Sequence, residues 1–148
     1  MTALDIAQIS TLLKREYPLL LIDGVTLIKP GVMCNAFKNL TYNEWFFPSH
    51  FPDHPIMPGS LQLEAFTQAF ALPLLINGNS ESDNEIPILL AGIDKVRYYR
   101  SVFPGDRLDI FVQIERVAMG IATANVKAEV REEIVTECKI TYKLMRGV

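Results

Sequence analysis

The stretch WFFPSHFPDHPIMPGSLQLEAFTQAFALPLL, Trp45 to Leu75, decides the fold of this chain. Four of the nine prolines fall within residues 48–58. Proline fixes φ and removes a backbone N–H donor, so this part can be neither a helix interior nor a central strand. Pro58-Gly59-Ser60 then opens a long apolar segment. We expect a stiff loop followed by a buried helix, which Pro73 should kink or end near Phe70.

Glu64 is the anomaly of that helix, because it is the only Asp, Glu, Lys or Arg between Asp53 and Glu81. Apolar residues cover most faces of the helix, and such a helix is normally buried. A carboxylate in that setting is costly unless it is paired, neutralised or facing a cavity. Gln68 follows one turn later on the same face. The two side chains form a polar strip, consistent with either a satisfied buried glutamate or a functional one.

His50 lies in the proline-rich loop among Phe46, Phe47 and Phe51. A lone loop histidine is more often a surface or hydrogen-bonding residue than a catalytic one. Here the prolines stiffen the loop, and apolar surroundings disfavour the charged form of the imidazole, which can act as a base when it is neutral. Together with Glu64 it makes a plausible base and acid, and the N–H groups at the helix start near Gly59 suit an anion. This set favours chemistry on a carbonyl compound with a nearby acidic proton.

The segment HFPDHPIMPGSLQLEAFTQA, residues 50–69, resembles the GHFPxxPxMPGVLxxEAxAQ signature of bacterial 3-hydroxyacyl-[acyl-carrier-protein] dehydratases. The resemblance continues through YPLLLIDGV (17–25), KNLTYNEWFF (38–47) and LAGIDKVRYYRSVFPGDRLDI (90–110), so it covers most of the chain in order. It departs at Ser49, where the family usually has Gly, and at Ser60, where it usually has Val. Glutamate rather than aspartate at position 64 favours plain dehydration over the dehydratase/isomerase relatives.

The resemblance implies an α+β hot-dog fold, an antiparallel sheet wrapped around the long helix, as a single domain over residues 1–148. It also implies His50 as the base, Glu64 of the partner subunit as the acid, and the Gly59 N–H as the group that polarises the thioester oxygen. The acyl chain is expected in an apolar tunnel along the helix, although ordinary core packing is the alternative for each lining residue. The expected substrate-binding residues are Leu61, Ala65, Gln68, Ala69, Tyr98 and Tyr99.

The implied partner is an acidic acyl carrier protein, and the implied assembly is a homodimer, extended in many members to a trimer of dimers. The densest basic group of the sequence is the predicted docking site for the carrier, although a solvated charged face is the alternative for most of its members. This group consists of Lys95, Arg97, Arg100 and Arg107. No cofactor and no metal are implied. A hot-dog thioesterase and a non-catalytic carrier-binding homologue are the alternatives to a dehydratase.

The composition and net charge of the chain argue against several classes of protein. Nearly half of the 148 residues are hydrophobic, yet no apolar run is long enough to span a bilayer, and no secretory signal is apparent. Cys34 and Cys138 lie far apart in strand-like stretches, which argues against a disulfide framework and for a reducing cytoplasm. The net charge of −3 argues against bulk nucleic-acid binding.

Hydrophobic periodicity predicts the remaining elements. A short helix is expected over 4–15, and an apolar run over 19–31 ends in the Pro30-Gly31 turn, across which a strand at 32–42 pairs back. A solvated loop is expected at 77–85. Four strands should follow as an antiparallel meander with one buried face, at 86–100, 107–117, 121–130 and 134–145.

Overall fold

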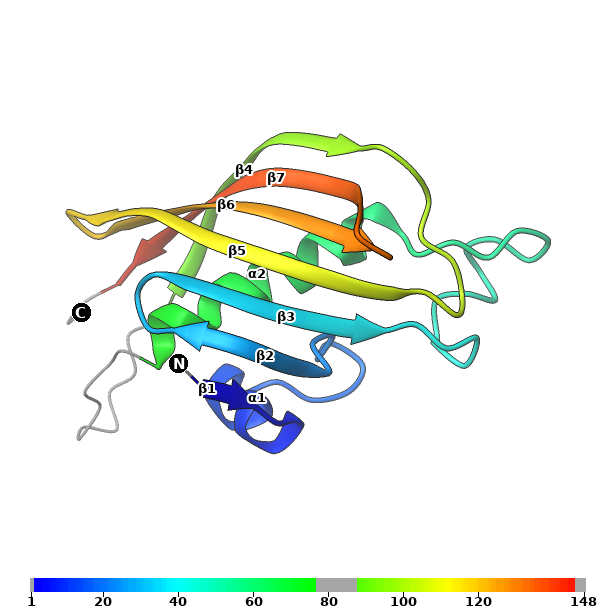
Figure 1. Ribbon diagram of the computed structural model, residues 1–148, viewed down its shortest axis with the longest axis horizontal. Coiled ribbons are helices and arrows are strands. Elements are labelled where there is room, and N and C mark those ends of the chain that lie inside the picture. The colour runs from blue at the N-terminus through cyan, green and yellow to red at the C-terminus, as the bar shows by residue number, and fades with distance from the viewer. Residues whose placement is uncertain (1, 77–87, 146–148) are drawn as a thin grey trace.

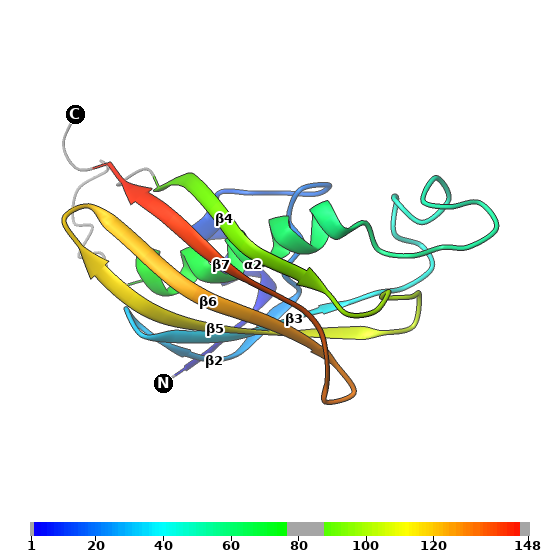
Figure 2. The ribbon, with the colours of Figure 1, turned by 90° about the horizontal axis from the view of Figure 1, so that it is seen from above.

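The computed structural model describes residues 2–76 and 88–145, so the loop predicted at 77–85 lies outside the described residues. Over those ranges the chain forms two helices, α1 (Ile6–Leu13) and α2 (Gly59–Leu75). The strands are β1 (Thr2–Leu4), β2 (Gly24–Lys29), β3 (Met33–Asn39), β4 (Ile88–Tyr98), β5 (Arg107–Ala118), β6 (Ile121–Val130) and β7 (Glu133–Leu144). They make one antiparallel sheet that curves around α2 (Figures 1 and 2).

The order of strands in the sheet is β1-β2-β3-β5-β6-β7-β4. Strands β5, β6 and β7 form the predicted meander, but β4 pairs with β7 at the far edge, and β3 takes the place beside β5. The expectation that β4 lies next to β5 is therefore wrong. The connection at 99–106 is longer than a hairpin turn and is tied to the proline-rich loop, where the Met57 N–H donates to Val102 O at 2.8 Å.

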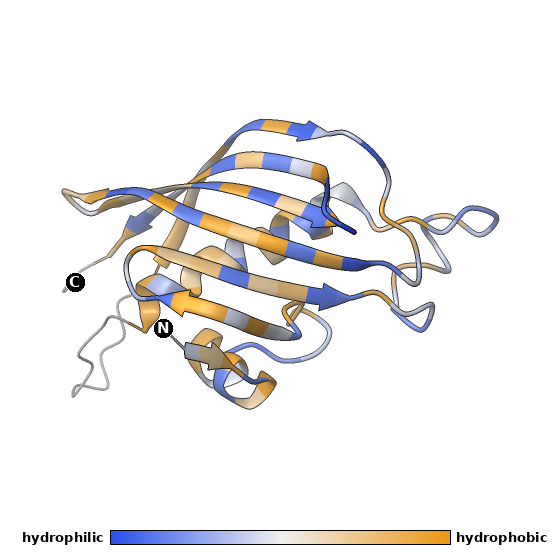
Figure 3. Ribbon diagram, viewed as in Figure 1, coloured by the Kyte–Doolittle hydropathy of each residue, from blue (hydrophilic) through white to orange (hydrophobic). Residues whose placement is uncertain are grey.

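The core lies between the sheet and α2. The strands alternate apolar and polar residues (Figure 3), and on β6 the inward positions are Ala122, Ala124, Val126, Ala128 and Val130, all buried. The predicted single buried face is thus confirmed. On β7, alternation along the sequence predicts that Ile134 shares the buried face with Thr136 and Cys138. This prediction is wrong at Ile134, because the register shifts between Ala128 and Glu129. The shift leaves Ile134 38% exposed and places Val135 in the core.

Both helices differ from their predicted bounds. Helix α1 is shorter because Asp5 caps it: the Gln8 N–H donates to Asp5 Oδ1 and the Asp5 N–H donates to Gln8 Oε1, both at 2.9 Å. Helix α2 continues through Pro73 to Leu75, so the prediction that it could end near Phe70 is wrong. A proline in the last turn removes only one helical hydrogen bond, and Phe70 and Leu72 are fully buried there.

Among the described residues, no helix combines the length and the apolar character needed to cross a membrane.

Candidate active site

His50 is held in the proline-rich loop between β3 and α2. Its ring stacks on Phe51 with a centroid distance of 4.1 Å, and its Nδ1 lies 3.1 Å from the carbonyl oxygen of Ile56. A carbonyl only accepts, so this contact assigns the hydrogen to Nδ1 and leaves Nε2 of the neutral ring with a free lone pair. A backbone hydrogen bond joins the same two residues, because the Ile56 N–H donates to His50 O at 2.9 Å. The ring is therefore oriented to accept a proton at Nε2.

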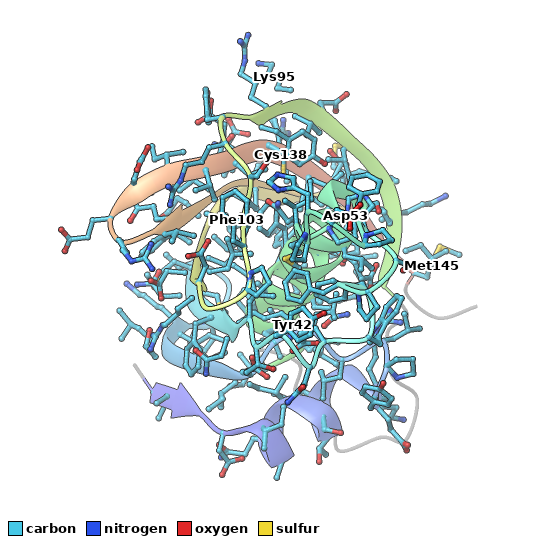
Figure 4. All side chains as sticks on the ribbon, turned by 90° about the vertical axis from the view of Figure 1, so that its right-hand side faces the viewer. Tyr42, Asp53, Lys95, Phe103, Cys138 and Met145 are labelled. Carbon is cyan, nitrogen blue, oxygen red and sulfur yellow. The ribbon has the colours of Figure 1, made fainter. Side chains whose placement is uncertain are left out.

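The loop that carries His50 is braced by its neighbours. Figure 4 views the molecule from the end where this loop lies, with Asp53 and Phe103 both near the middle of the view. The rings of His54 and Phe103 pack edge to face at 5.7 Å. Phe46 and Phe47 are buried beneath, with ring centroids 4.7 Å apart. The proline-rich segment thus has the packed support that a fixed imidazole requires.

Glu64 lies on α2, partly buried, and its carboxylate is held by Gln68, whose Nε2 donates to Glu64 Oε1 at 3.0 Å. The same Nε2 donates to Leu19 O at 2.6 Å, and Gln68 Oε1 accepts from the Leu21 N–H at 2.9 Å. The predicted polar strip of Glu64 and Gln68 is therefore confirmed. Both polar atoms of the Gln68 amide already form hydrogen bonds within the protein, and only 2% of the residue is exposed. Its position suits orienting Glu64 rather than contacting a substrate.

Gly59 is the first residue of α2, following Pro58, which has no side chain that could cap the helix. The first N–H groups of a helix have no intrahelical partner and carry the positive end of its dipole. A Cβ added at Gly59 would lie 2.7 Å from Cζ of Tyr98, so any other residue there would require the Tyr98 ring to move. The sequence correctly predicted that the helix begins near Gly59. The close approach of Tyr98 depends on strand pairing, which the sequence did not predict.

The predicted substrate-lining residues separate into three groups. Ala65 and Ala69 are completely buried on α2, and Leu61 packs partly buried against the core. Tyr98 reaches the inner face of the sheet at the helix start, where its register partner is Thr136. Tyr99 lies on the opposite side: its hydroxyl donates to Glu137 Oε1, and Glu137 lines the outer face. The structure thus brings Tyr98, but not Tyr99, to Gly59.

The four predicted carrier-binding cations do not form one patch. Arg107 pairs with Asp109 at 2.9 Å and covers the ring of Phe37, and Arg100 pairs with Glu133 at 3.6 Å. Lys95 and Arg97 instead line a trough of about 1040 Å³ on the sheet face opposite α2, whose other lining residues include Phe111, Lys127 and Lys139. The spacing of these charges along the sequence did not predict which of them line the trough. A register shift between Asp94 and Arg97 determines the face of the sheet to which the β4 side chains point.

The family model for the FabA-like domain matches residues 13–139. The chain belongs to this family. A protein of Nitrosomonas europaea named 3-hydroxyacyl-[acyl-carrier-protein] dehydratase FabZ is 41% identical over 94% of this chain and 91% of its own. Its Listeria welshimeri namesake is also 41% identical, over 95% and 96%. The resemblance found in the sequence is confirmed.

Solved structures confirm the hot-dog fold of this FabA-like chain. The dehydratase heterocomplex ApeI:P from Xenorhabdus doucetiae has a TM-score of 0.78 at 14% identity, covering 92% of this chain and 90% of that one. A hypothetical thioesterase from Streptococcus pneumoniae, solved with coenzyme A, has a TM-score of 0.63 at 10% identity over 82% and 84%. At such identities the likeness shows the fold alone. Proteins described by both activities share it, so the site must decide between them.

Proposed function

We propose that this chain dehydrates 3-hydroxyacyl groups carried by an acyl carrier protein to trans-2-enoyl groups, in fatty-acid or related acyl-chain synthesis. The observation that carries the proposal is the orientation of His50, whose Nδ1–H donates to Ile56 O and whose Nε2 has no partner among residues 2–76 and 88–145. The curated relatives bear the same activity in their names. Elimination needs a base and an acid held apart, and the chain supplies a fixed imidazole and a fixed carboxyl group.

The proposed mechanism follows from these groups. His50 Nε2 takes the proton from the carbon beside the thioester carbonyl, and the Gly59 N–H stabilises the negative charge that develops on the thioester oxygen. Glu64, oriented by Gln68, gives a proton to the departing 3-hydroxyl, which leaves as water. Proton transfer by positioned groups contributes roughly 10²–10⁴-fold, and one oxyanion donor about 10²–10³-fold.

We propose that His50 and Glu64 of one site come from two subunits. Within residues 2–76 and 88–145, no hydrogen bond joins the two side chains. Strand β4 is a sheet edge with β7 as its one neighbour among the described strands, and it exposes about half of Leu89 and of Leu90. A long apolar edge is a template for pairing with a second chain. We therefore propose that two copies of the chain pair through β4 and form a homodimer with shared sites. We also expect three such dimers to associate.

Incubation with a crotonyl thioester tests the proposed function directly. We expect the reverse reaction, in which water adds across the double bond and gives the 3-hydroxybutyryl thioester, because base and acid are placed for proton transfer rather than thioester cleavage. Chromatography of the thioester and a free-thiol assay measure the two outcomes together. Release of free thiol without hydration would instead support the thioesterase, and no reaction would support the carrier-binding homologue.

Lys95 and Arg97 are the cations that we propose as the carrier-docking pair, since neither forms an ion pair with the described residues. A solvent-exposed charge pair contributes about 0.2–1 kcal/mol, so the loss of two pairs in the Lys95→Ala/Arg97→Ala double variant is expected to lower kcat/KM on carrier-bound substrate about 2- to 30-fold. A small thioester should be turned over normally. Arg100→Ala is the matched control, because Arg100 already pairs with Glu133. Equal losses on both substrates would contradict carrier docking.

A further inference from the structure

The first turn of α2 docks on one cross-strand pair, Tyr98 of β4 and Thr136 of β7. The position that a Cβ of Gly59 would take lies 2.7 Å from Cζ and 2.8 Å from the hydroxyl oxygen of Tyr98, closer than real Cβ contacts come. One turn along, the Thr136 hydroxyl donates to Gln62 Oε1 at 2.5 Å. The phenol of Tyr98 therefore lies directly beside the residue whose N–H is proposed to polarise the thioester.

The hydroxyl of Tyr98 forms no hydrogen bond with the described residues, and 49% of the residue is exposed. The comparison with two other tyrosines is informative. The Tyr99 hydroxyl donates to Glu137 Oε1, and the Tyr142 hydroxyl donates to Thr67 O at 2.7 Å. Burial raises the pKa of Tyr98 above its ordinary value, with a smaller contribution from Cys138, so the hydroxyl keeps its proton at neutral pH. Tyr98 thus holds an unused donor at the helix start.

Gln62 provides a second, independent observation. It is 2% exposed, and its Oε1 accepts from Thr136, yet in the part of the chain that the structure describes its Nε2 has no acceptor. This nitrogen is not wholly enclosed, because among the described residues the only fully buried side-chain nitrogen or oxygen without a partner is Arg100 Nε. It is therefore open to donate to water or to a bound ligand. Because Gln62 and Gly59 are three residues apart, they lie on neighbouring parts of one helix face. The amide of Gln62 therefore provides, near Tyr98, a second polar group with a donor that the described residues leave open.

We infer that the Tyr98 hydroxyl donates a second hydrogen bond to the thioester oxygen of the bound substrate, next to that of the Gly59 N–H. This inference rests on the proposed dehydration. When His50 removes the proton, the electron pair of the broken C–H bond moves toward the thioester oxygen, and two donors share the resulting charge. Tyr98 does not transfer its proton. It keeps the O–H bond throughout, while the hydroxyl group of the substrate leaves with a proton from Glu64.

The test is Tyr98→Phe, which keeps the ring against Gly59 and removes only the hydroxyl. Because Tyr98 is partly exposed, we expect kcat for the 3-hydroxyacyl thioester to fall about 10- to 100-fold, at or below the effect of a fully enclosed oxyanion donor. KM and the melting temperature should be unchanged, since the hydroxyl has no partner among the described residues. Tyr99→Phe is the matched control: it removes a hydroxyl that is bonded to Glu137 and should leave kcat unchanged.

The outcomes separate this inference from the proposed function. If wild type dehydrates the thioester and Tyr98→Phe matches it in kcat, the second donor is refuted while the dehydratase stands. The second donor is also refuted if only KM changes, because a group that acts on the developing charge acts on kcat. If wild type itself fails to dehydrate any thioester, the proposed function falls first. A selective loss of kcat in Tyr98→Phe, with normal melting, supports the inference.

Discussion

Replacement of His50 by alanine is expected to lower the rate of dehydration by roughly 10²–10⁴-fold, the contribution typical of a positioned general base. The side chain is partly buried, and among the described residues its one side-chain hydrogen bond is to Ile56 O. Its loss removes the proposed proton acceptor and the stacking contact with Phe51. Steady-state assays of the 3-hydroxyacyl thioester measure kcat, and circular dichroism verifies the fold. The loss should appear in kcat, because substrate binding does not depend on the imidazole.

His54→Ala is the matched control for this variant. His54 lies four residues further along the same loop, is exposed, and packs edge to face on Phe103. We expect it to keep nearly full activity, because the ring has no place in the proposed proton transfer. A His50→Ala protein that dehydrates at the wild-type rate, or a His54→Ala protein that loses as much, would refute the assignment of the base.

The sequence was most informative about the helix that carries the site. The polar strip of Glu64 and Gln68 followed from spacing alone, and the hydrogen bond of 3.0 Å between them confirms it. The partners of Gln68 on the other side, Leu19 and Leu21, could not be predicted, because they are 49 and 47 residues away and are joined through backbone atoms. Side-chain periodicity carries no information about which distant carbonyl or N–H will meet an amide.

Strand order was the part that local patterns did not determine. Alternation along 107–117 and 121–130 correctly predicted which faces are buried. Alternation shows which face of a strand is buried, but it does not show which strand lies beside it. The long connection at 99–106 permits either a return to the adjacent position or a crossing to the far edge. The observed crossing places β4 beside β7, where Tyr98 pairs with Thr136 and lies against Gly59. The contact between Tyr98 and Gly59 could not be predicted from the sequence, because it depends on which strand lies beside β7.

Glu64→Gln is the second substitution with a large expected effect, again about 10²–10⁴-fold in the rate of dehydration. The amide keeps the shape of the carboxyl group and an oxygen that can accept the bond from Gln68 Nε2, so the α2 contacts of Gln68 with Leu19 and Leu21 should survive. What is lost is the exchangeable proton for the departing hydroxyl. Thermal melting should therefore match wild type while kcat collapses.

Mixing the two inactive proteins gives the sharper form of this prediction. If each site takes His50 from one subunit and Glu64 from its partner, a mixed dimer of His50→Ala and Glu64→Gln chains holds one doubly damaged site and one intact site. Random reassociation of equal amounts should restore about a quarter of the wild-type activity, because half of the dimers of a two-fold assembly are mixed. If both groups belong to one chain, every site keeps one defect. In that case, mixing restores nothing even when tagged subunits demonstrate exchange.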